Sequence, residues 1–282
     1  MRVAIVFYGL MRNLRATFPS IHNNIFKSMR RGGIEFDVFL HTYYLETLSN
    51  FRSNEENVLL NNEEWKMLYP KAYLVDRQDE VDQILPHEEF CRLENPWPTS
   101  DPTRNSMKNL LRQLYSLKRV WSLLESEGPY DGYLILRPDL IYQYPLHLPS
   151  RLAVANDVIF LPEWGTGTSL GYNDRICFTS WEGARVVMNR LDSVMDYGRA
   201  HPPHSQKFLR HVVDSHPFRT RSMFLYGKRV RAGDHSVPVK DKSEQWYNIA
   251  LQDFQSKTSH AFWAVDGDVF VLFETDLKEI SS

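Results

Sequence analysis

The sequence predicts an α/β fold in which helices flank a mixed, mostly parallel central sheet of the Rossmann-like kind. Short apolar runs rich in β-branched and aromatic residues alternate with stretches of helical apolar spacing along most of the chain. Charged or polar residues follow several of these runs directly. Hydrophobic residues make up 43% and charged residues 24% of the 282, so the chain can bury a core of its own.

The first elements are expected to form a βαβ unit. Residues 2–8 are a continuous apolar run ending at Gly9, which is typical of a strand covered on both faces. The apolar residues of 13–30 recur at helical spacing and predict a helix. Residues 36–42 then predict a second strand, parallel to the first, and 72–76 a third.

The middle of the chain contains the clearest helix. Residues 86–102 include Pro96, Pro98 and Pro102, and we expect a surface loop there that could act as a lid. The apolar positions of 106–127 recur at helical spacing until Gly128-Pro129, which predicts a long amphipathic helix. Residues 133–136 form the next buried strand.

The remaining elements continue the alternation. We expect strands at 157–161 and 176–179, a glycine-containing loop at 165–171 and a helix at 181–191. Near the C-terminus, residues 262–273 predict a hairpin centred on Asp266-Gly267, a favoured two-residue turn.

Charge and composition exclude several classes of function. The net charge of -2 gives no general attraction to nucleic acid. No run of about 18 apolar residues occurs, so we expect no membrane span. Only two cysteines are present, Cys91 and Cys177, and the start of the chain lacks the pattern of a signal peptide. These observations predict a soluble protein of the cytoplasm.

The most informative motif is Arg137-Pro138-Asp139, which follows a buried strand directly. Ligands of α/β sheets bind at the carboxyl ends of strands, so this motif predicts a site. Arg137 could neutralise a phosphate, and Asp139 could hold Mn²⁺ or Mg²⁺ or accept a hydrogen bond from a sugar hydroxyl. The alternative is an ion pair that only caps the strand.

A second acidic site is expected at Asp174, in the segment Gly171-Tyr172-Asn173-Asp174. A carboxylate that faces the first motif across a cleft could act as a general base. The alternative is an Asx turn that joins two elements.

Weaker signals surround these two sites. Gly9, Arg12 and Asn13 stand where the first strand turns into a helix, and Thr42 ends the second strand, so all four could contact a nucleotide. Arg229 and Arg231 alternate around Val230 and could grip a diphosphate from one face of an extended segment. The alternatives are an ordinary turn at Gly9 and a solvated edge strand at the two arginines.

Other motifs are absent or misplaced. There is no GxGxxG, no P-loop and no hydrolase signature. Asp266-Gly267-Asp268 has the letters of an Asp-x-Asp metal motif, but its place in a predicted hairpin argues against that role.

The order of the runs AIVFYGLMRN, FDVFLHTYY, YDGYLILRPDL and GYNDRICF resembles a group of glycosyltransferases from large DNA viruses of algae, the chloroviruses, and from bacterial surface-polysaccharide clusters. The resemblance covers roughly residues 1–235. It implies a GT-A-like fold over 1–282 as a single domain, with the nucleotide-binding part at about 1–145 and the acceptor side and hairpin at about 146–282. In this family the strand-end motif usually contains two aspartates, and Arg137 replaces the first.

The resemblance also implies roles and ligands. Asp174 would be the base of an inverting transfer, Asp139 would orient the donor or a metal, and Arg137 with Arg229 or Arg231 would stabilise the leaving group. The donor would be a UDP- or GDP-sugar and the acceptor an oligosaccharide or glycoprotein. Two alternatives remain: a sugar nucleotidyltransferase or phosphotransferase, and a non-catalytic glycan-binding module using Trp97, Trp164 and Trp181.

Overall fold

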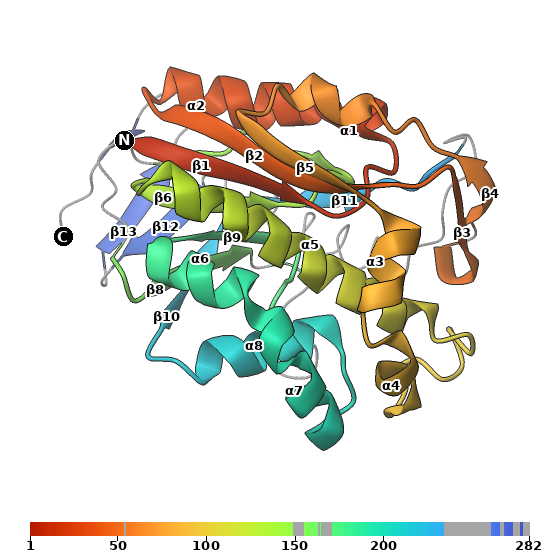
Figure 1. The fold of residues 1–282 in the computed structure, drawn as a ribbon. Coiled ribbons are helices and arrows are strands. Elements are labelled where there is room, and N and C mark those ends of the chain that lie inside the picture. The colour runs from red at the N-terminus through yellow and green to blue at the C-terminus, as the bar shows by residue number, and fades with distance from the viewer. Residues whose placement is uncertain are drawn as a thin grey trace.

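The structure is a computed structural model that describes residues 1–53, 55–148, 155–162, 164, 171–233, 261–265, 268–272 and 277–278. In this part of the chain a central seven-stranded sheet lies between two layers of helices (Figure 1). The predicted fold class, a mostly parallel mixed sheet flanked by helices, is therefore confirmed.

The order of the strands explains where a ligand can bind. From one edge to the other the strands are β10 (Arg219–Met223), β8 (Val158–Pro162), β9 (Ile176–Thr179), β6 (Gly132–Leu136), β1 (Arg2–Tyr8), β2 (Glu35–Tyr44) and β5 (Ala72–Arg77). Neighbouring strands pair in parallel except β9, which is antiparallel to both β6 and β8. The carboxyl ends of β1, β2, β5 and β6 therefore meet at one edge of the sheet.

One layer consists of the helix predicted at 13–30. It begins at α1 (Leu14–Ser20), widens to a π-helical segment at Ile21–Phe26 and ends with α2 (Lys27–Arg31). Pro19 lies just before the wider turn and has no N–H for the helical ladder, which accounts for the irregularity. The apolar side of this layer packs on the same face of the sheet as Ile5 and Leu40.

The other layer is built on α5 (Asn105–Glu127), the long helix predicted at 106–127. It packs with α6 (Trp181–Met188), α7 (Val194–Ala200) and α8 (Ser205–Asp214) on the opposite face of the sheet (Figure 1). The helix predicted at 181–191 ends at Met188, because the Asn189 amide caps the carbonyl of Arg185 at 2.8 Å. Among the described residues no helix has both the length and the apolar content to cross a membrane.

Several short elements were not predicted. They include α3 (Gln78–Ile84), α4 (His87–Arg92), β3 (Thr47–Asn50) and β4 (Glu55–Leu59). The elements α7, α8 and β10, given above, were not predicted either. The prediction of a loop over 86–102 is thus wrong in its first half. Glu88 and Glu89 favour a helix N-terminus, and Phe90 is fully buried in the core. The three prolines lie in the loop that follows α4, whose role as a lid stays a prediction.

The C-terminal part agrees with the expected pattern where it is described. β11 (Gly227–Arg229) pairs antiparallel with β7 (Leu140–Tyr142), just beyond the end of β6. In the predicted hairpin, β12 (Ala261–Val265) pairs antiparallel with β13 (Asp268–Leu272), and β14 (Leu277–Lys278) pairs with β13. The turn Asp266-Gly267 and the loop 165–170 lie outside the described residues.

Candidate functional site

A cleft of about 220 Å³ opens at the carboxyl edge of the sheet. Its walls come from the segments that follow β1, β2, β5 and β6 and from the first turns of α5. Three guanidinium groups line it, those of Arg12, Arg112 and Arg137. Arg112 is held by Asp82 through two hydrogen bonds of 2.7 Å, while Arg12 and Arg137 supply the cationic side of the cleft beside the predicted motif.

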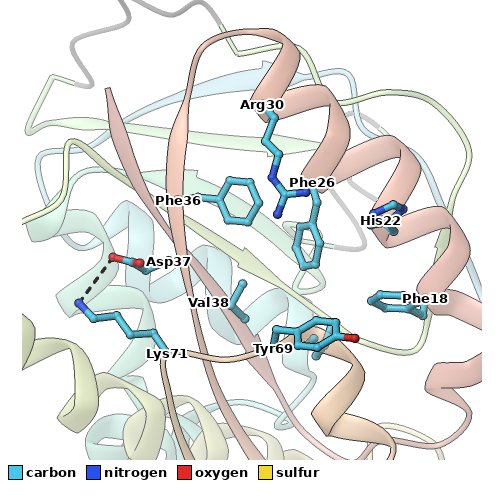
Figure 2. A pocket seen from close by; sticks show the side chains of 10 residues that line it. Phe18, His22, Phe26, Arg30, Phe36, Asp37, Val38, Tyr69 and Lys71 are labelled. Carbon is cyan, nitrogen blue, oxygen red and sulfur yellow. Dashed lines mark ion pairs between the residues drawn. The ribbon is translucent and has the colours of Figure 1, made fainter.

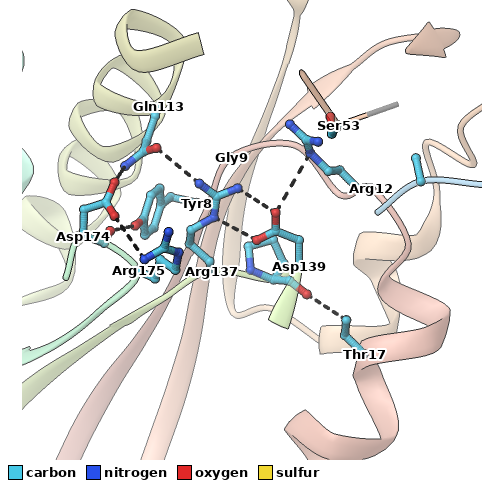
Figure 3. Close-up of polar contacts among 12 residues, drawn as sticks. Tyr8, Gly9, Arg12, Thr17, Ser53, Gln113, Arg137, Asp139, Asp174 and Arg175 are labelled. Carbon is cyan, nitrogen blue, oxygen red and sulfur yellow. Dashed lines mark hydrogen bonds and ion pairs between the residues drawn. The ribbon is translucent and has the colours of Figure 1, made fainter. Parts of the chain in front are cut away.

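The motif after β6 forms a bidentate ion pair (Figure 3). Arg137 Nε donates to Asp139 Oδ1 at 2.8 Å, and Arg137 Nη2 donates to Asp139 Oδ2 at 2.7 Å. The backbone of the motif is fixed as well: Thr17 Oγ1 donates to Pro138 O at 2.7 Å, and Val230 N donates to Asp139 O at 2.8 Å. Both side chains are therefore held in one orientation before any ligand arrives.

Asp139 is buried, with only 1% of its surface exposed. Burial alone would raise the pKa of its carboxyl group. The adjacent Arg137, with Arg12 and Arg231 further away, outweighs burial and holds the pKa below its ordinary value. Arg12 Nε lies 4.0 Å from Asp139 Oδ2, so a second cation backs the pair.

Glu55 is a site residue that the sequence did not reveal. It stands at the start of β4 with 3% of its surface exposed and accepts a hydrogen bond of 2.6 Å from Arg12 Nη1. Ser53 Oγ also donates to this carboxylate, and Ala232 N donates to Glu55 Oε1 at 2.8 Å. Glu55 lies in a polar stretch with no clear periodicity, so no pattern separated it from surface carboxylates.

Arg231 extends the cationic group behind the cleft. Burial, together with the like charges of Arg229 and Arg12, lowers its pKa to about 9. Arg229 in turn acts on Arg175, which is followed by β9. Five guanidinium groups therefore gather around three carboxylates, and the excess positive charge favours an anionic ligand. The five are Arg12, Arg137, Arg175, Arg229 and Arg231, and the three are Glu55, Asp139 and Asp174.

Asp174 lies on the other side of Arg137, and Gln113 of α5 links the two. Gln113 Oε1 accepts a hydrogen bond of 3.2 Å from Arg137 Nη1, and Gln113 Nε2 donates to Asp174 Oδ2 at 3.1 Å (Figure 3). Arg175 Nη1 lies 3.8 Å from Asp174 Oδ1. Burial raises the pKa of Asp174, but Arg175 and Arg137 outweigh it and bring that pKa down to about 2.

The local fold explains why Asp174 lies in this position. Gly171 has φ +91°, and a Cβ there would come 2.3 Å from the Gln206 carbonyl oxygen. Tyr172 N donates to the same oxygen at 3.1 Å, so the segment is tied to the first turn of α8. Asn173, whose Oδ1 accepts a 2.9 Å bond from Arg175 N, makes the Asx turn that was the alternative for Asp174. The Asp174 side chain is left to face Gln113.

Of the other residues predicted to contact a nucleotide, Gly9 lines the cleft, whereas Asn13 and Thr42 do not. Gly9 lines the cleft with φ +92°, and its N–H donates to Ser116 Oγ at 2.7 Å. The Asn13 side chain instead caps α1 by accepting a hydrogen bond from Ala16 N at 3.1 Å. Thr42 is buried, with an Oγ1 that meets no partner among the described residues, and it does not line the cleft. Contacts of Asn13 and Thr42 with a nucleotide stay predictions.

Three amide side chains of α5 line the cleft and were also missed. Asn105, Asn109 and Gln113 recur at four-residue spacing, which puts them on one face of the helix. That spacing is visible in the sequence, but polar residues at four-residue spacing are also typical of an ordinary solvated helix face. The amides add hydrogen-bonding capacity beside the arginines.

A group of Ser, His and Asp lies beneath Gly9. His41 Nδ1 is 2.7 Å from Ser116 Oγ, and His41 Nε2 is 3.2 Å from Asp76 Oδ2. The arrangement has the order of a hydrolase triad, but Ser116 and His41 are fully buried. Because Ser116 Oγ accepts the Gly9 N–H, this group braces the wall of the cleft.

The residues around Asp139 do not fit a divalent metal ion. Both carboxylate oxygens are already bound by Arg137, and the groups nearest to them are cations. In the part of the chain that the structure describes, no three His, Cys, Asp or Glu side chains converge on a common point. The donor set suits a phosphate group better than Mn²⁺ or Mg²⁺.

A second cleft, of about 450 Å³, lies at the other end of the sheet (Figure 2). Phe18, Phe26, Phe36 and Tyr69 line it, with the Lys71–Asp37 ion pair at one side. It borders the start of β2 rather than its carboxyl end, and it contains none of the predicted site residues. The smaller cleft is therefore the candidate site.

No protein-family model and no curated protein matches the chain. Solved structures with a similar arrangement include the glycosyltransferase GlyE of Streptococcus pneumoniae TIGR4, at 10% identity and a TM-score of 0.39, with 78% of this chain and 45% of GlyE covered. Mouse xyloside xylosyltransferase 1 has 11% identity and a TM-score of 0.36, covering 79% and 85%. A glycosyltransferase involved in the glycosylation of the major capsid of PBCV-1 has 11% identity and a TM-score of 0.37, covering 79% and 81%.

The chain thus spans less than half the length of GlyE. None of these identities or TM-scores places the chain in a family. The function therefore rests on the cleft and the side chains around it.

Proposed function

We propose that this chain is a glycosyltransferase of GT-A-like fold, which transfers a sugar from a UDP- or GDP-sugar to a hydroxyl group of a glycan. The observation that carries the proposal is the gathering of arginines at the carboxyl edge of a mostly parallel sheet, beside a buried carboxylate on each side of Arg137. A diphosphate is the anion that such a cluster suits. The order of motifs in the sequence supports the same activity.

The chemistry would be a direct displacement with inversion. The acceptor oxygen attacks the anomeric carbon, the bond from that carbon to the phosphate oxygen breaks, and the nucleoside diphosphate leaves with the electron pair. Asp174 accepts the acceptor's proton as the new bond forms. Arg137 and Arg12 in the cleft, with Arg231 behind them, stabilise the charge on the leaving group.

This assignment makes the transfer independent of a metal ion. In sites with two aspartates, a bound Mn²⁺ or Mg²⁺ neutralises the diphosphate. In the proposed site the guanidinium groups neutralise it instead. Asp139 then orients Arg137 and does not bind a metal. Addition of a chelator should leave the rate unchanged.

The low pKa of Asp174 has a consequence for the pH profile. Because that pKa is about 2, the carboxylate is ionised and able to accept a proton throughout the neutral range. It is a weak base, so the proton should move to it late in the formation of the bond to the anomeric carbon. We expect kcat/KM to show no acid limb from Asp174 between pH 8 and 5.

The glycan-binding alternative finds no support in the predicted tryptophans. Trp181 packs on Trp121 with ring centroids 4.4 Å apart, inside the core. Trp164 stacks on Tyr226, and Trp97 lies between His204 and Arg52. All three side chains are partly buried and contact other side chains of the protein, which favours a structural role for them.

The first test is thermal unfolding with UDP, GDP, CMP and their sugar conjugates, each with and without Mn²⁺. Specific binding at about 100 times Kd stabilises a fold by roughly 2.7 kcal/mol, so a clear rise in Tm is expected with UDP or GDP. Stabilisation by oligosaccharides alone would instead indicate a glycan-binding module. In a separate assay, conversion of the sugar nucleotide and added pyrophosphate into a nucleoside triphosphate and a sugar 1-phosphate would indicate a nucleotidyltransferase.

The second test concerns the base. Asp174→Asn keeps the shape of the side chain but removes its capacity to accept a proton, and should lower kcat by roughly 10²- to 10⁴-fold while the nucleotide still raises Tm. Asp196→Asn, at an exposed Asp paired with Arg199 on α7, is the matched control and should be neutral. Full turnover by Asp174→Asn would remove Asp174 from the mechanism.

A further inference from the structure

Arg190 is a buried cation near the candidate site, and it has no role in the proposed mechanism. It begins the 3₁₀ segment Arg190–Ser193, and only 3% of its surface is exposed. Its Nη1 donates to the Val187 carbonyl oxygen, but its Nε is buried without a hydrogen-bond partner. Among the described residues no carboxylate lies within ion-pair distance of it.

A buried arginine lowers the stability of the fold unless a nearby group compensates its charge. Moving a guanidinium group out of water costs several kcal/mol even after the protein relaxes. Neutral apolar residues of similar volume are usually at least as stable in such a position. The charge of Arg190 therefore calls for a partner, and after burial its pKa is influenced by Tyr8 and then by Asp174, the carboxylate among these groups.

A small cavity lies between the two residues. It measures about 10 Å³ and is lined by Arg190 and Asp174, together with Tyr8, Asn173 and Cys177. This volume is close to what a single water molecule requires. The lining also supplies the two or more polar partners that a buried water needs. Tyr8 fixes the remaining wall, because its hydroxyl donates to the Asp174 carbonyl oxygen at 2.6 Å.

We propose that Arg190 is the positioning residue of Asp174, and that one water molecule in their shared cavity links the guanidinium group to the Asp174 segment. The link would keep the carboxylate ionised and directed toward Gln113 and the cleft. The catalytic consequence rests on the proposed function, but the electrostatic link does not.

The surroundings of Asp174 agree with this role. Burial raises its pKa, whereas Arg175, Arg137, the Gln113 hydrogen bond and Arg190 lower it, in that order. Besides these arginines, Tyr8 and His204 at the start of α8 are titratable groups whose pKa Asp174 raises. Arg190 lines the small cavity and not the cleft, so a substrate that enters the cleft would not displace it.

The test compares Arg190→Met, which keeps the length and removes the charge, with Arg190→Lys, which keeps a charge. Asp174 is titrated in each protein by carbon-13 NMR of its carboxyl group, assigned through Asp174→Asn, without any substrate. Arg190→Met should move the titration to higher pH, and Arg190→Lys should leave it near that of the wild type. Arg185→Met, at an exposed arginine of α6 paired with Glu182, should change nothing.

A folded Arg190→Met protein with an unchanged Asp174 titration would overturn the inference. If Arg190→Met fails to fold, the presence or absence of the water molecule in the wild type still decides it. A high-resolution crystal structure or water-to-protein NOEs should detect the water in the wild type, and a dry cavity would contradict the link. Because the titration needs no substrate, a protein that transfers no sugar but shows the expected shift would disprove only the proposed function.

Discussion

Arg137 determines what Asp139 can do. An aspartate at a strand end commonly collects a metal ion, but here both carboxylate oxygens are bound by the guanidinium group two residues earlier. Asp139 therefore acts on the cleft through Arg137. The pair is buried on the Asp139 side and partly open on the Arg137 side, where 20% of the side chain is exposed. An arriving anion would thus meet the cation first.

This arrangement predicts a strong dependence of stability on both partners. Arg137→Met should lower the free energy of unfolding by roughly 3 to 5 kcal/mol, because it leaves Asp139 charged and buried. The double variant Arg137→Met/Asp139→Leu should recover most of that loss, since no unpaired charge remains. Urea unfolding monitored by circular dichroism measures both values.

The surface variant Arg185→Met provides the baseline for the same experiment and should stay within about 0.5 kcal/mol of wild type. A double variant as unstable as Arg137→Met alone would mean that other contacts of Arg137, such as that with Gln113, dominate its contribution.

Among the secondary structure elements, those with continuous apolar sequence could be predicted and the short polar ones could not. β1 and β6 are buried on both faces, so their apolar runs are diagnostic. α3 and α4 are short and rich in charge, and each buries few side chains, so their patterns are faint. The antiparallel direction of β9 depends on tertiary packing, which a local sequence pattern does not encode.

Some residues of the candidate site could likewise be predicted from the sequence, and others could not. Charges at strand ends, such as Arg137 and Asp139, could be predicted because the topology sends those ends to one edge of the sheet. Glu55 could not, since its place beside Arg12 depends on packing, and Gln113 lies on a predicted helix whose polar positions do not stand out from an ordinary solvated face. Sequence reasoning thus finds the centre of the site more readily than its outer contacts.

The segment that carries Asp174 offers a test of this packing. Gly171→Ala should cost more than an ordinary glycine substitution, because it combines a positive φ with a Cβ 2.3 Å from the Gln206 carbonyl oxygen. Left-handed backbone costs roughly 1–2 kcal/mol and overpacking a further 1–3 kcal/mol or so. Turnover should fall as well, because the shift displaces Asp174.

Gly33→Ala is the matched control. Gly33 also has a positive φ, +66°, but nothing lies within 4 Å of the place its Cβ would take, so only the backbone cost applies. Equal losses of stability in the two variants would show that α8 gives way and that the segment is not held against it.

For the molecule as a whole, the buried charges make stability depend on pH. The pKa values of four aspartates are lowered in the fold, to about 2 for Asp82 and Asp174. At Asp82, Asp139 and Asp174 nearby cationic side chains outweigh the effect of burial. At Asp76 the largest contribution is the hydrogen bond with His41. Burial lowers the pKa of His41, which therefore stays neutral in the fold. All five groups bind a proton more readily in the unfolded chain than in the native one.

The sign of the effect follows from this difference. A group whose pKa is lowered by folding contributes stability above its unfolded pKa and loses that contribution as pH falls toward its folded value. His41 should begin to destabilise the fold below about pH 6.5, and the carboxylates below about pH 4. Asp174 alone should account for about 2 kcal/mol between pH 4 and 2. The free energy of unfolding should therefore fall in two steps.

Urea unfolding at pH 7, 5.5, 4 and 3 measures both steps. The double variant Arg137→Met/Asp139→Leu lacks one of the buried acids, so its acid step should be smaller than that of the wild type while its histidine step is unchanged. A free energy of unfolding that stays constant from pH 7 to 3 would mean that the buried carboxylates keep their ordinary pKa values, and that the cations around the cleft are not close enough to serve a leaving diphosphate.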